Sequence, residues 1–110
     1  MELALTNIAT RLKSLTNPWS PIELARFDDH VIRLALFHGE YHWHFHPNGD
    51  DTFYVYRGEV VMQMRGKPNQ IVREGEFFVV PKGIPHCAKS EGKSYVVMFQ
   101  AEDLRSEKVS

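Results

Sequence analysis

Short runs in which apolar and polar residues alternate occupy most of the chain from residue 21 onward. Successive side chains of an extended strand point to opposite faces, so such runs predict strands. Turn-forming residues separate the runs at regular intervals, which is typical of an all-β sandwich or barrel. The predicted strands span residues 21–27, 30–37, 40–45, 52–57, 60–65, 70–73, 77–80, 87–89 and 93–100.

The segment before these strands follows a helical period instead. Apolar residues recur there at three- and four-residue spacing and predict a short amphipathic helix over residues 4–15. The prolines at positions 18 and 21 end it, because proline disfavours a helical conformation in the residue before it. A frayed tail is the alternative, and in either case we assign this segment to packing, across the barrel or against a partner subunit. The stripe consists of Leu5, Ile8, Leu12 and Leu15.

The same alternation predicts which side chains fill the barrel. Val60, Met62 and Met64 alternate with more outward positions, and Phe53 and Val55 share strand parity with Asp51. We therefore expect all of them to face inward, mainly as core packing, because the interior of a small barrel must be filled.

Length and composition indicate one domain over residues 1–110, with a helical arm at 1–17, a barrel at 21–100 and a polar tail at 102–110 that we expect to fray. Thirteen basic and fourteen acidic residues leave a net charge of −1. This balance, without a dense basic patch, argues against nucleic acid as a partner. The single cysteine favours a reducing, cytoplasmic location, and we expect neither a signal peptide nor a membrane span.

Candidate chemistry begins with two histidines in a predicted strand. His44 and His46 have the same parity, so their imidazoles point the same way. The loop of residues 47–50, Pro-Asn-Gly-Asp, can reverse the chain and return Asp51 beside them. Two imidazoles and a carboxylate suit a divalent transition metal. The alternative is that these residues only form the solvated face of a hairpin.

A second segment adds a third imidazole. Gly75 is followed after five residues by Pro81, and Gly83 and His86 follow in a Pro-x-Gly-x-x-His pattern. A strand over residues 77–80 and a tight turn would deliver His86 to the first cluster. This holds if the strand packs against the hairpin that carries the other two histidines.

Together the two segments resemble the paired motifs of the cupin superfamily, and more narrowly the small single-domain cupins called mannose-6-phosphate isomerase-like. The first motif appears as His44-x-His46, four residues, Asp51, six residues and Gly58, with Gly39 one place nearer to His44 than usual. The second motif appears from Gly75 to His86, with Ser90 where asparagine is usual. The resemblance spans residues 39–90.

This resemblance implies a small jelly-roll barrel, a double-stranded β-helix, with a metal held inside by three histidines and an acid. The expected ligands are His44, His46, Asp51 and His86, and the metal would be zinc, iron, manganese or nickel. Cupins usually carry glutamate where this chain has Asp51, whose reach is shorter by about 1.5 Å. Asp51 could ligate directly, bind through water or have no role. We favour direct or water-mediated ligation by Asp51. Asp50 is the second choice for the acidic ligand, because its strand parity directs it to the opposite face.

The other histidines and the cysteine are weaker candidates. His42 shares parity with His44 and could line the pocket mouth or ligate, but a hydrogen-bonded bystander is more common, and His38 is weaker still. His30 follows a turn and should be exposed. We expect Cys87 to be a small buried hydrophobe that points away from His86.

Trp43 and Phe45 should lie on the outer face, opposite the histidine pair. A second subunit could cover them, and small cupins by resemblance form homodimers, so we predict a homodimer. Coverage by the N-terminal helix of the same subunit is the alternative.

Three functions stay open for this metal site. The first is a metal-dependent enzyme acting on a small oxygen-bearing molecule, an oxygenase or an isomerase or epimerase by resemblance. The second is a small-molecule binder or sensor without turnover, and the third a degenerate scaffold that binds metal weakly. A sugar phosphate is disfavoured, because inward placement is not evident for the candidate basic residues, Arg33, Arg57, Arg65, Arg73 and Lys82.

Overall fold

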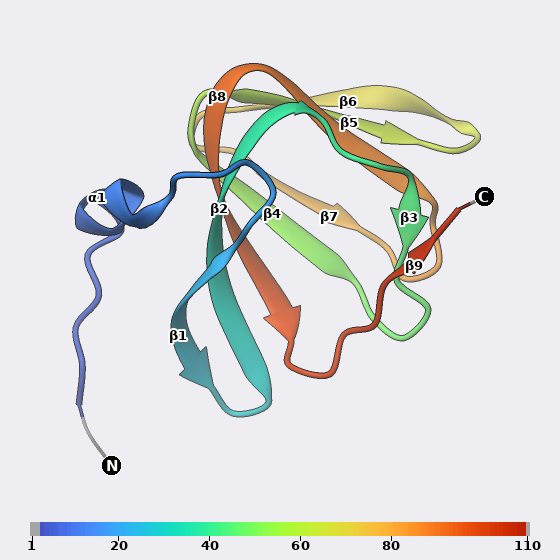
Figure 1. Ribbon diagram of the computed structural model, residues 1–110. Helices are drawn as coiled ribbons and strands as arrows, with labels where there is room; N and C mark the ends of the chain where they lie inside the picture. The colour runs from blue at the N-terminus through green and yellow to red at the C-terminus, as the bar shows by residue number, and fades with distance from the viewer. Residues whose placement is uncertain (1–2, 110) are drawn as a thin grey trace.

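The alternating runs form one nine-stranded antiparallel sheet that curls on itself (Figure 1). This computed structural model describes residues 3–109. The prediction of a mostly β fold with one short N-terminal helix is confirmed. The strands are β1 (Ile22–Phe27), β2 (His30–Glu40), β3 (His44–Phe45), β4 (Asp51–Arg57), β5 (Glu59–Met64), β6 (Lys67–Arg73), β7 (Phe77–Val80), β8 (His86–Ala101) and β9 (Glu107–Lys108).

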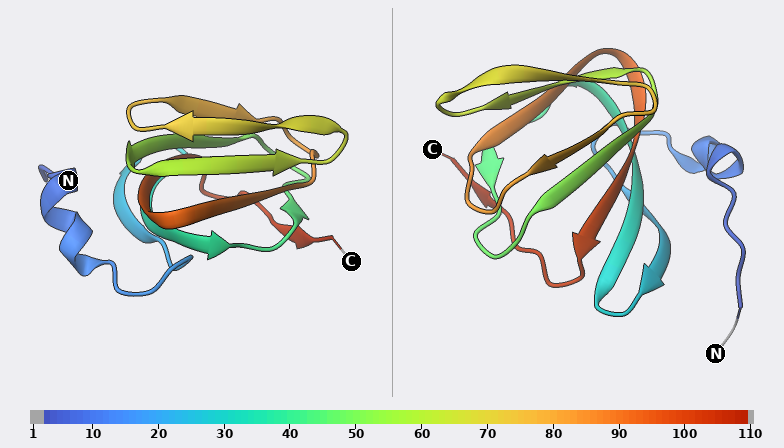
Figure 2. Two further views of the ribbon diagram at one scale, coloured as in Figure 1. Left: turned by 90° about the horizontal axis from the view of Figure 1, so that it is seen from above. Right: turned by 180° about the vertical axis from the view of Figure 1, so that it is seen from behind.

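Strand β8 connects the two sides of the barrel. It pairs with β2, β3, β4 and β5, and both views in Figure 2 show it curving across the molecule. We expected two strands here, separated by a turn at residues 90–92. The structure absorbs that turn as a bulge, since the β2–β8 register passes from Phe37–Ser94 to Gly39–Ser90. Gly39 adopts a φ of +83°, a conformation that favours glycine.

The N-terminal helix is shorter than predicted. Helical residues are α1 (Ile8–Arg11) and a 3-10 turn, η1 (Leu12–Ser14), because the Asn7 side chain accepts a hydrogen bond from Thr10 N at 3.0 Å and caps the helix there. Leu5 lies before the cap and is fully exposed. The rest of the predicted stripe packs within the same subunit, on a cluster formed by Leu24, Leu34 and Val97.

The inward-facing positions were predicted correctly. Val60, Met62, Met64, Phe53 and Val55 are all buried and belong to one inner cluster. Cys87 is also fully buried, and burial raises the pKa of its thiol, as expected for an inert cysteine. Within residues 3–109, no helix has the length and apolar character needed to cross a membrane.

The described part of the tail, residues 102–109, returns to the barrel, so the prediction that it frays is wrong there, and residue 110 lies outside the described residues. Strand β9 pairs with β3, with His44 opposite Lys108 and Phe45 opposite Glu107. Figure 1 shows this last segment returning beside β3. The backbone N–H and C=O groups of the short strand β3 thereby gain hydrogen-bond partners. The polar sequence of the tail gave no sign that it would pair with a strand.

Candidate metal centre

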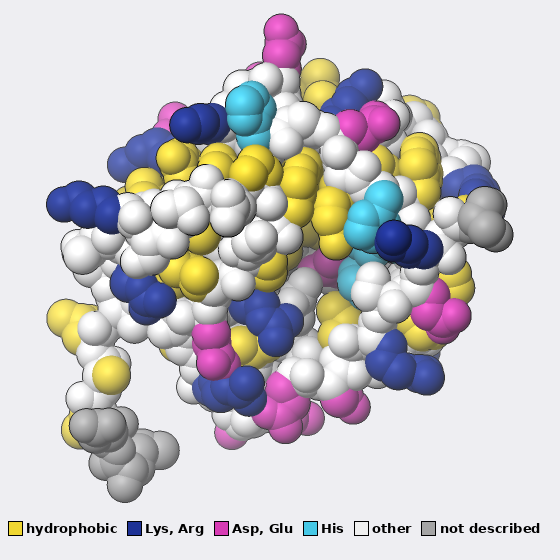
Figure 3. Space-filling model, in the orientation of Figure 1, with side chains coloured by type: hydrophobic (Ala, Val, Ile, Leu, Met, Phe, Trp, Pro, Cys, Tyr) yellow, Lys and Arg dark blue, Asp and Glu magenta, His cyan; other side chains and the backbone are white. Residues whose placement is uncertain are grey.

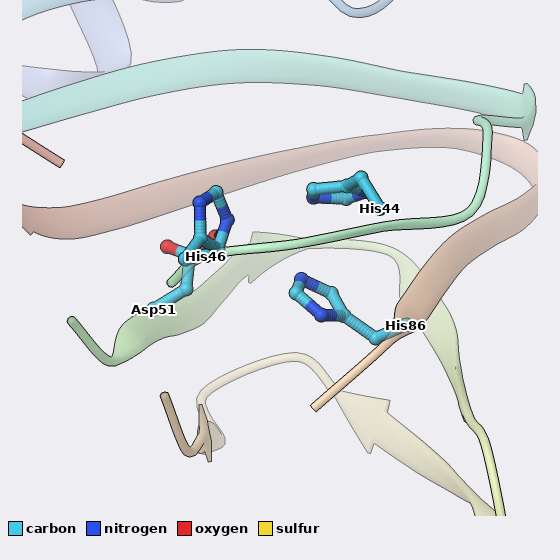
Figure 4. Close-up of side chains that lie close together, drawn as sticks. All are labelled: His44, His46, Asp51 and His86. Atoms are coloured by element: carbon cyan, nitrogen blue, oxygen red, sulfur yellow. Dashed lines mark hydrogen bonds and ion pairs between the residues drawn. The ribbon is translucent and has the colours of Figure 1, made fainter. Parts of the chain in front are cut away.

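Four side chains from separate parts of the chain meet inside the barrel (Figure 4). His44, His46, Asp51 and His86 are all buried, and one ligand atom from each lies within 4.8 Å of the others. His44 and His86 are direct cross-strand partners on β3 and β8. The structure therefore brings together the four residues that the two sequence motifs predicted.

The turns beside the cluster connect the two motifs. The carboxylate of Asp50 accepts a hydrogen bond from Lys82 N at 2.8 Å, and the carbonyl of His46 accepts one from Gly83 N at 2.9 Å. Asp50 is thus directed away from the cluster, as its strand parity predicted. These two bonds tie the loop after β3 to the turn before His86.

Each imidazole of the cluster is oriented by a backbone carbonyl. Nδ1 of His44 lies 3.0 Å from the carbonyl of His42, Nδ1 of His86 lies 2.8 Å from that of Ile84, and Nδ1 of His46 lies 2.8 Å from that of Arg105. A carbonyl can only accept, so Nδ1 carries the proton on all three rings. Nε2 of the neutral rings is left with a lone pair, the arrangement that metal-ligating histidines adopt.

Two contacts show that these donors fit a cation. Nε2 of His86 is buried without any hydrogen-bond partner, and such an atom is costly unless something binds it. Nε2 of His46 lies 3.0 Å from Oδ2 of Asp51. Since Nδ1 of His46 already donates to Arg105, that second contact requires either a proton or a cation between the two atoms. Imidazole and carboxylate donors suit a divalent transition metal.

The surroundings lower the pKa of two of the three histidines and raise that of the third. Burial lowers the pKa of His44 to about 4, and burial also lowers that of His86. Burial opposes protonation of His46 as well, but its hydrogen bonds to Asp51 and the Arg105 carbonyl overcome this effect and raise its pKa. At neutral pH, His44 and His86 are thus ready to donate lone pairs, whereas His46 holds a proton more readily.

Asp51 reaches the cluster because it begins β4 directly beside His46. One oxygen, Oδ2, faces His46, and the other, Oδ1, accepts a hydrogen bond from Gln100 Nε2 at 2.9 Å. Gln100 was not anticipated from the sequence. Its strand parity could have indicated it, since Val96 and Met98 on β8 face inward and Gln100 continues that alternation.

A cavity of about 280 Å³ opens beside the cluster. In Figure 3, histidine and acidic atoms lie side by side in a hollow of this face. Aromatic rings line much of it, from Trp19, Phe37, Tyr41 and Phe53. Arg33 also lines the cavity, so the structure shows an inward placement that was not evident from the sequence. Its strand parity with Ala35 and Phe37 was the missed signal.

The remaining histidines lie outside the cluster. The backbone carbonyl of His42 accepts a hydrogen bond from His44, but the His42 ring is not part of the cluster. His38 is exposed, and its carbonyl accepts a hydrogen bond from Trp19 Nε1. His30 is exposed, as predicted, and contacts Asp29. Trp43 and Phe45 are half-buried, and the homodimer based on them stays a prediction.

The tail supplies a part of the site that sequence reasoning did not anticipate. Besides the Arg105 carbonyl, Leu104 and Ser106 line the cavity. The Asn48 side chain holds this segment, donating to the Asp103 carbonyl at 2.9 Å and accepting from Arg105 N at 2.8 Å. The Arg105 carbonyl accepts a hydrogen bond from His46 through its backbone. Every residue has such a carbonyl, so the sequence could not reveal this contact.

Comparison with known proteins agrees with this geometry. A family model described as a cupin domain matches residues 36–101. The chain is 36% identical over 67 residues to the uncharacterized protein YdbB of Bacillus subtilis (strain 168). The aligned region covers 61% of this chain and 59% of that protein. The chain is 29% identical over 62 residues to 3-hydroxyanthranilate 3,4-dioxygenase of Bos taurus, covering 54% of this chain and 22% of that enzyme.

A solved structure shares nearly the whole fold. The crystal structure of a cupin-2 domain containing protein from Shewanella frigidimarina superimposes with a TM-score of 0.83 at 26% identity. The superposition covers 86% of this chain and 92% of that one.

Proposed function

Because the chain belongs to the cupin domain family, we propose that its buried cluster binds a divalent transition metal and that this metal holds a small oxygen-bearing substrate. The observation that carries the proposal is the buried, unpartnered Nε2 of His86, which faces two further imidazoles and a carboxylate. A cation among them would satisfy His86 and separate His46 from Asp51.

The chain's own groups assign a role to each ligand. His44, His46 and His86 would donate through Nε2, because Nδ1 of each ring is committed to a carbonyl. Asp51 would donate through Oδ2, which faces His46, while Oδ1 accepts the hydrogen bond from Gln100. The bound metal would supply Lewis-acid polarisation of an oxygen ligand and, if it is iron, activation of dioxygen.

The cavity favours an enzyme over a degenerate scaffold. A scaffold that had lost its metal would have no reason to keep three oriented imidazoles around a polar cavity, since burying unsatisfied polar groups destabilises the fold. A six-coordinate metal would keep two positions beyond these four ligands, and the cavity is the space from which a substrate could reach them. We propose oxygenase-type chemistry, and the partial match to a dioxygenase supports it.

Metal analysis followed by turnover assays tests this proposal. The protein purified without chelator should contain about one transition-metal ion per chain, and chelation should lower its melting temperature, because the ion binds only the folded state. The iron-loaded protein should then consume dioxygen with a small aromatic diol such as catechol.

The outcomes separate the alternatives. Metal binding without dioxygen uptake or any product would favour a binder or sensor. A melting temperature that is unchanged by chelation, in protein that contains no metal, would favour the degenerate scaffold. A His86→Ala variant is the matched control for uptake that arises from free iron.

A further inference from the structure

Arg33 is a positively charged group in the cavity with no negative partner. Its side chain is half-buried, and none of the ion pairs found across residues 3–109 includes it. It is the single Lys or Arg among the described residues that line the cavity. A guanidinium in a partly desolvated site favours an anion there, because an unpaired charge is costly to bury.

Hydrogen bonds connect Arg33 to the metal cluster. Its Nη1 donates to Oε1 of Gln100 at 2.7 Å, and Nε2 of Gln100 donates to Oδ1 of Asp51 at 2.9 Å. Arg33 can only donate and ionised Asp51 can only accept, so the Gln100 amide has one possible orientation. The guanidinium is therefore held at one side of the cavity, two hydrogen bonds from the cluster, with further N–H donors available.

Aromatic rings form one side of the cavity. The Trp19 ring lies 4.5 Å from that of Phe37 and 4.9 Å, stacked, from that of Tyr41. Trp19 has a φ of +63°, which bulky residues rarely adopt, and hydrogen bonds from its backbone and its indole hold it there. These three rings give one side of the cavity a fixed aromatic surface, which suits an aromatic ligand.

We infer that the cavity binds a small aromatic monocarboxylate, with the carboxylate on Arg33, the ring against the aromatic side of the cavity, and a second oxygen directed to the metal. One guanidinium matches one carboxylate in a bidentate pair, whereas a phosphate dianion would call for more cationic groups. The cavity of about 280 Å³ has room for a ligand of the size of a substituted benzoate. This inference rests on the proposed metal-binding function.

Matched ligands test the inference without an activity assay. Zinc-loaded protein at pH 7.5 is titrated by calorimetry with 3-hydroxybenzoate and with its uncharged analogue, 3-hydroxybenzamide. The carboxylate should bind at least about tenfold more tightly, as expected for a charge-assisted hydrogen-bond pair. Arg33→Gln should remove this preference while the amide binds as before. Arg65→Gln, which removes an exposed arginine, should retain it.

Each other result contradicts the inference. Equal binding of both ligands by the wild type, or no binding of either, overturns it without needing any variant to fold. If Arg33→Gln weakens both ligands equally, Arg33 only supports Gln100 and Asp51, which also overturns it. The zinc content of the same sample distinguishes the proposals. If zinc is bound but the carboxylate is not preferred over the amide, this inference alone is contradicted. If the protein cannot hold zinc, the metal-binding function is contradicted as well.

Discussion

Two parts of one barrel interior, built from the same strands, have opposite character. The packed part consists of apolar side chains that fill the space completely, among them Val55, Val60, Met62 and Val96, which are 0–2% exposed. The polar part holds the three histidines, Asp51 and the cavity. Strand β4 runs from one to the other, with Asp51 at the cluster and Val55 in the packed core.

The difference shows what alternation does and does not decide. Parity decides that Asp51, Phe53 and Val55 all face inward. Whether an inward position is dry or polar depends on the side chains that neighbouring strands place beside it. The cross-strand partner of Val55 is Val96, whereas Asp51 contacts His46 and Gln100. The packed part stabilises the fold. The polar part lowers the stability of the fold, because it buries polar groups, and it provides the groups that can bind a metal.

The strongest test of this division removes one imidazole from the polar part. His46→Ala should lower the bound metal at least tenfold, because one of four ligands is lost, while the far-UV spectrum remains that of a β protein. Metal content after dialysis measures the effect. His38→Ala changes an exposed histidine and should leave metal content unchanged. A His46→Ala protein that keeps its metal would contradict ligation by His46.

The reciprocal change belongs to the packed part. Met62→Ala should destabilise the protein by about 2–5 kcal/mol, because it leaves a cavity around a fully buried side chain. Denaturant unfolding of the metal-free protein measures this. Val61→Ala, at a half-buried outward position, should cost less. The folded Met62→Ala protein should still bind metal in the wild-type ratio, and a lost site would show that the two parts are not separable.

Acidification should act on the polar part alone. Metal affinity should fall as the pH drops from 8 towards about 6, because an imidazole must be neutral to ligate. The pKa of His46 is raised, so protons compete there first, whereas the lowered pKa values of His44 and His86 keep those rings neutral to lower pH. Equilibrium dialysis across this range measures it. An unchanged metal content between pH 8 and 5.5 would contradict imidazole ligation.

The smallest effect is expected where the tail supports the polar part. Asn48→Ala removes the two hydrogen bonds that hold residues 103 and 105, and so loosens the carbonyl that orients His46. Metal affinity should fall by about tenfold, at the lower end for a group that supports a ligand. Competition with a metal-binding dye measures it, with the exposed Asn69→Ala as control. Wild-type affinity in Asn48→Ala would mean that the tail does not tune the site.

Local signals predicted much of the structure and failed at identifiable places. The parity of Val60, Met62 and Met64 placed the core, and motif spacing identified the four clustered residues. The helix was predicted too long, because Leu5 fits the apolar period but Asn7 caps the helix after it. The turn signal at residues 90–92 became a bulge, because β2 supplies a continuous partner across it.

The sequence by itself determined the strand period, the inward faces and the spacing of two histidine motifs, because these depend on neighbours along the chain. Tertiary structure decided that the motifs meet, that Arg33 and Gln100, which parity only turns inward, bond to each other and to Asp51, and that a polar tail supplies a carbonyl to His46. The hydrogen bonds that link Arg33 to Gln100, Gln100 to Asp51 and His46 to Arg105 join residues 49 to 67 positions apart in sequence. Contacts over such separations arise only when the sheet closes, so no local pattern encodes them.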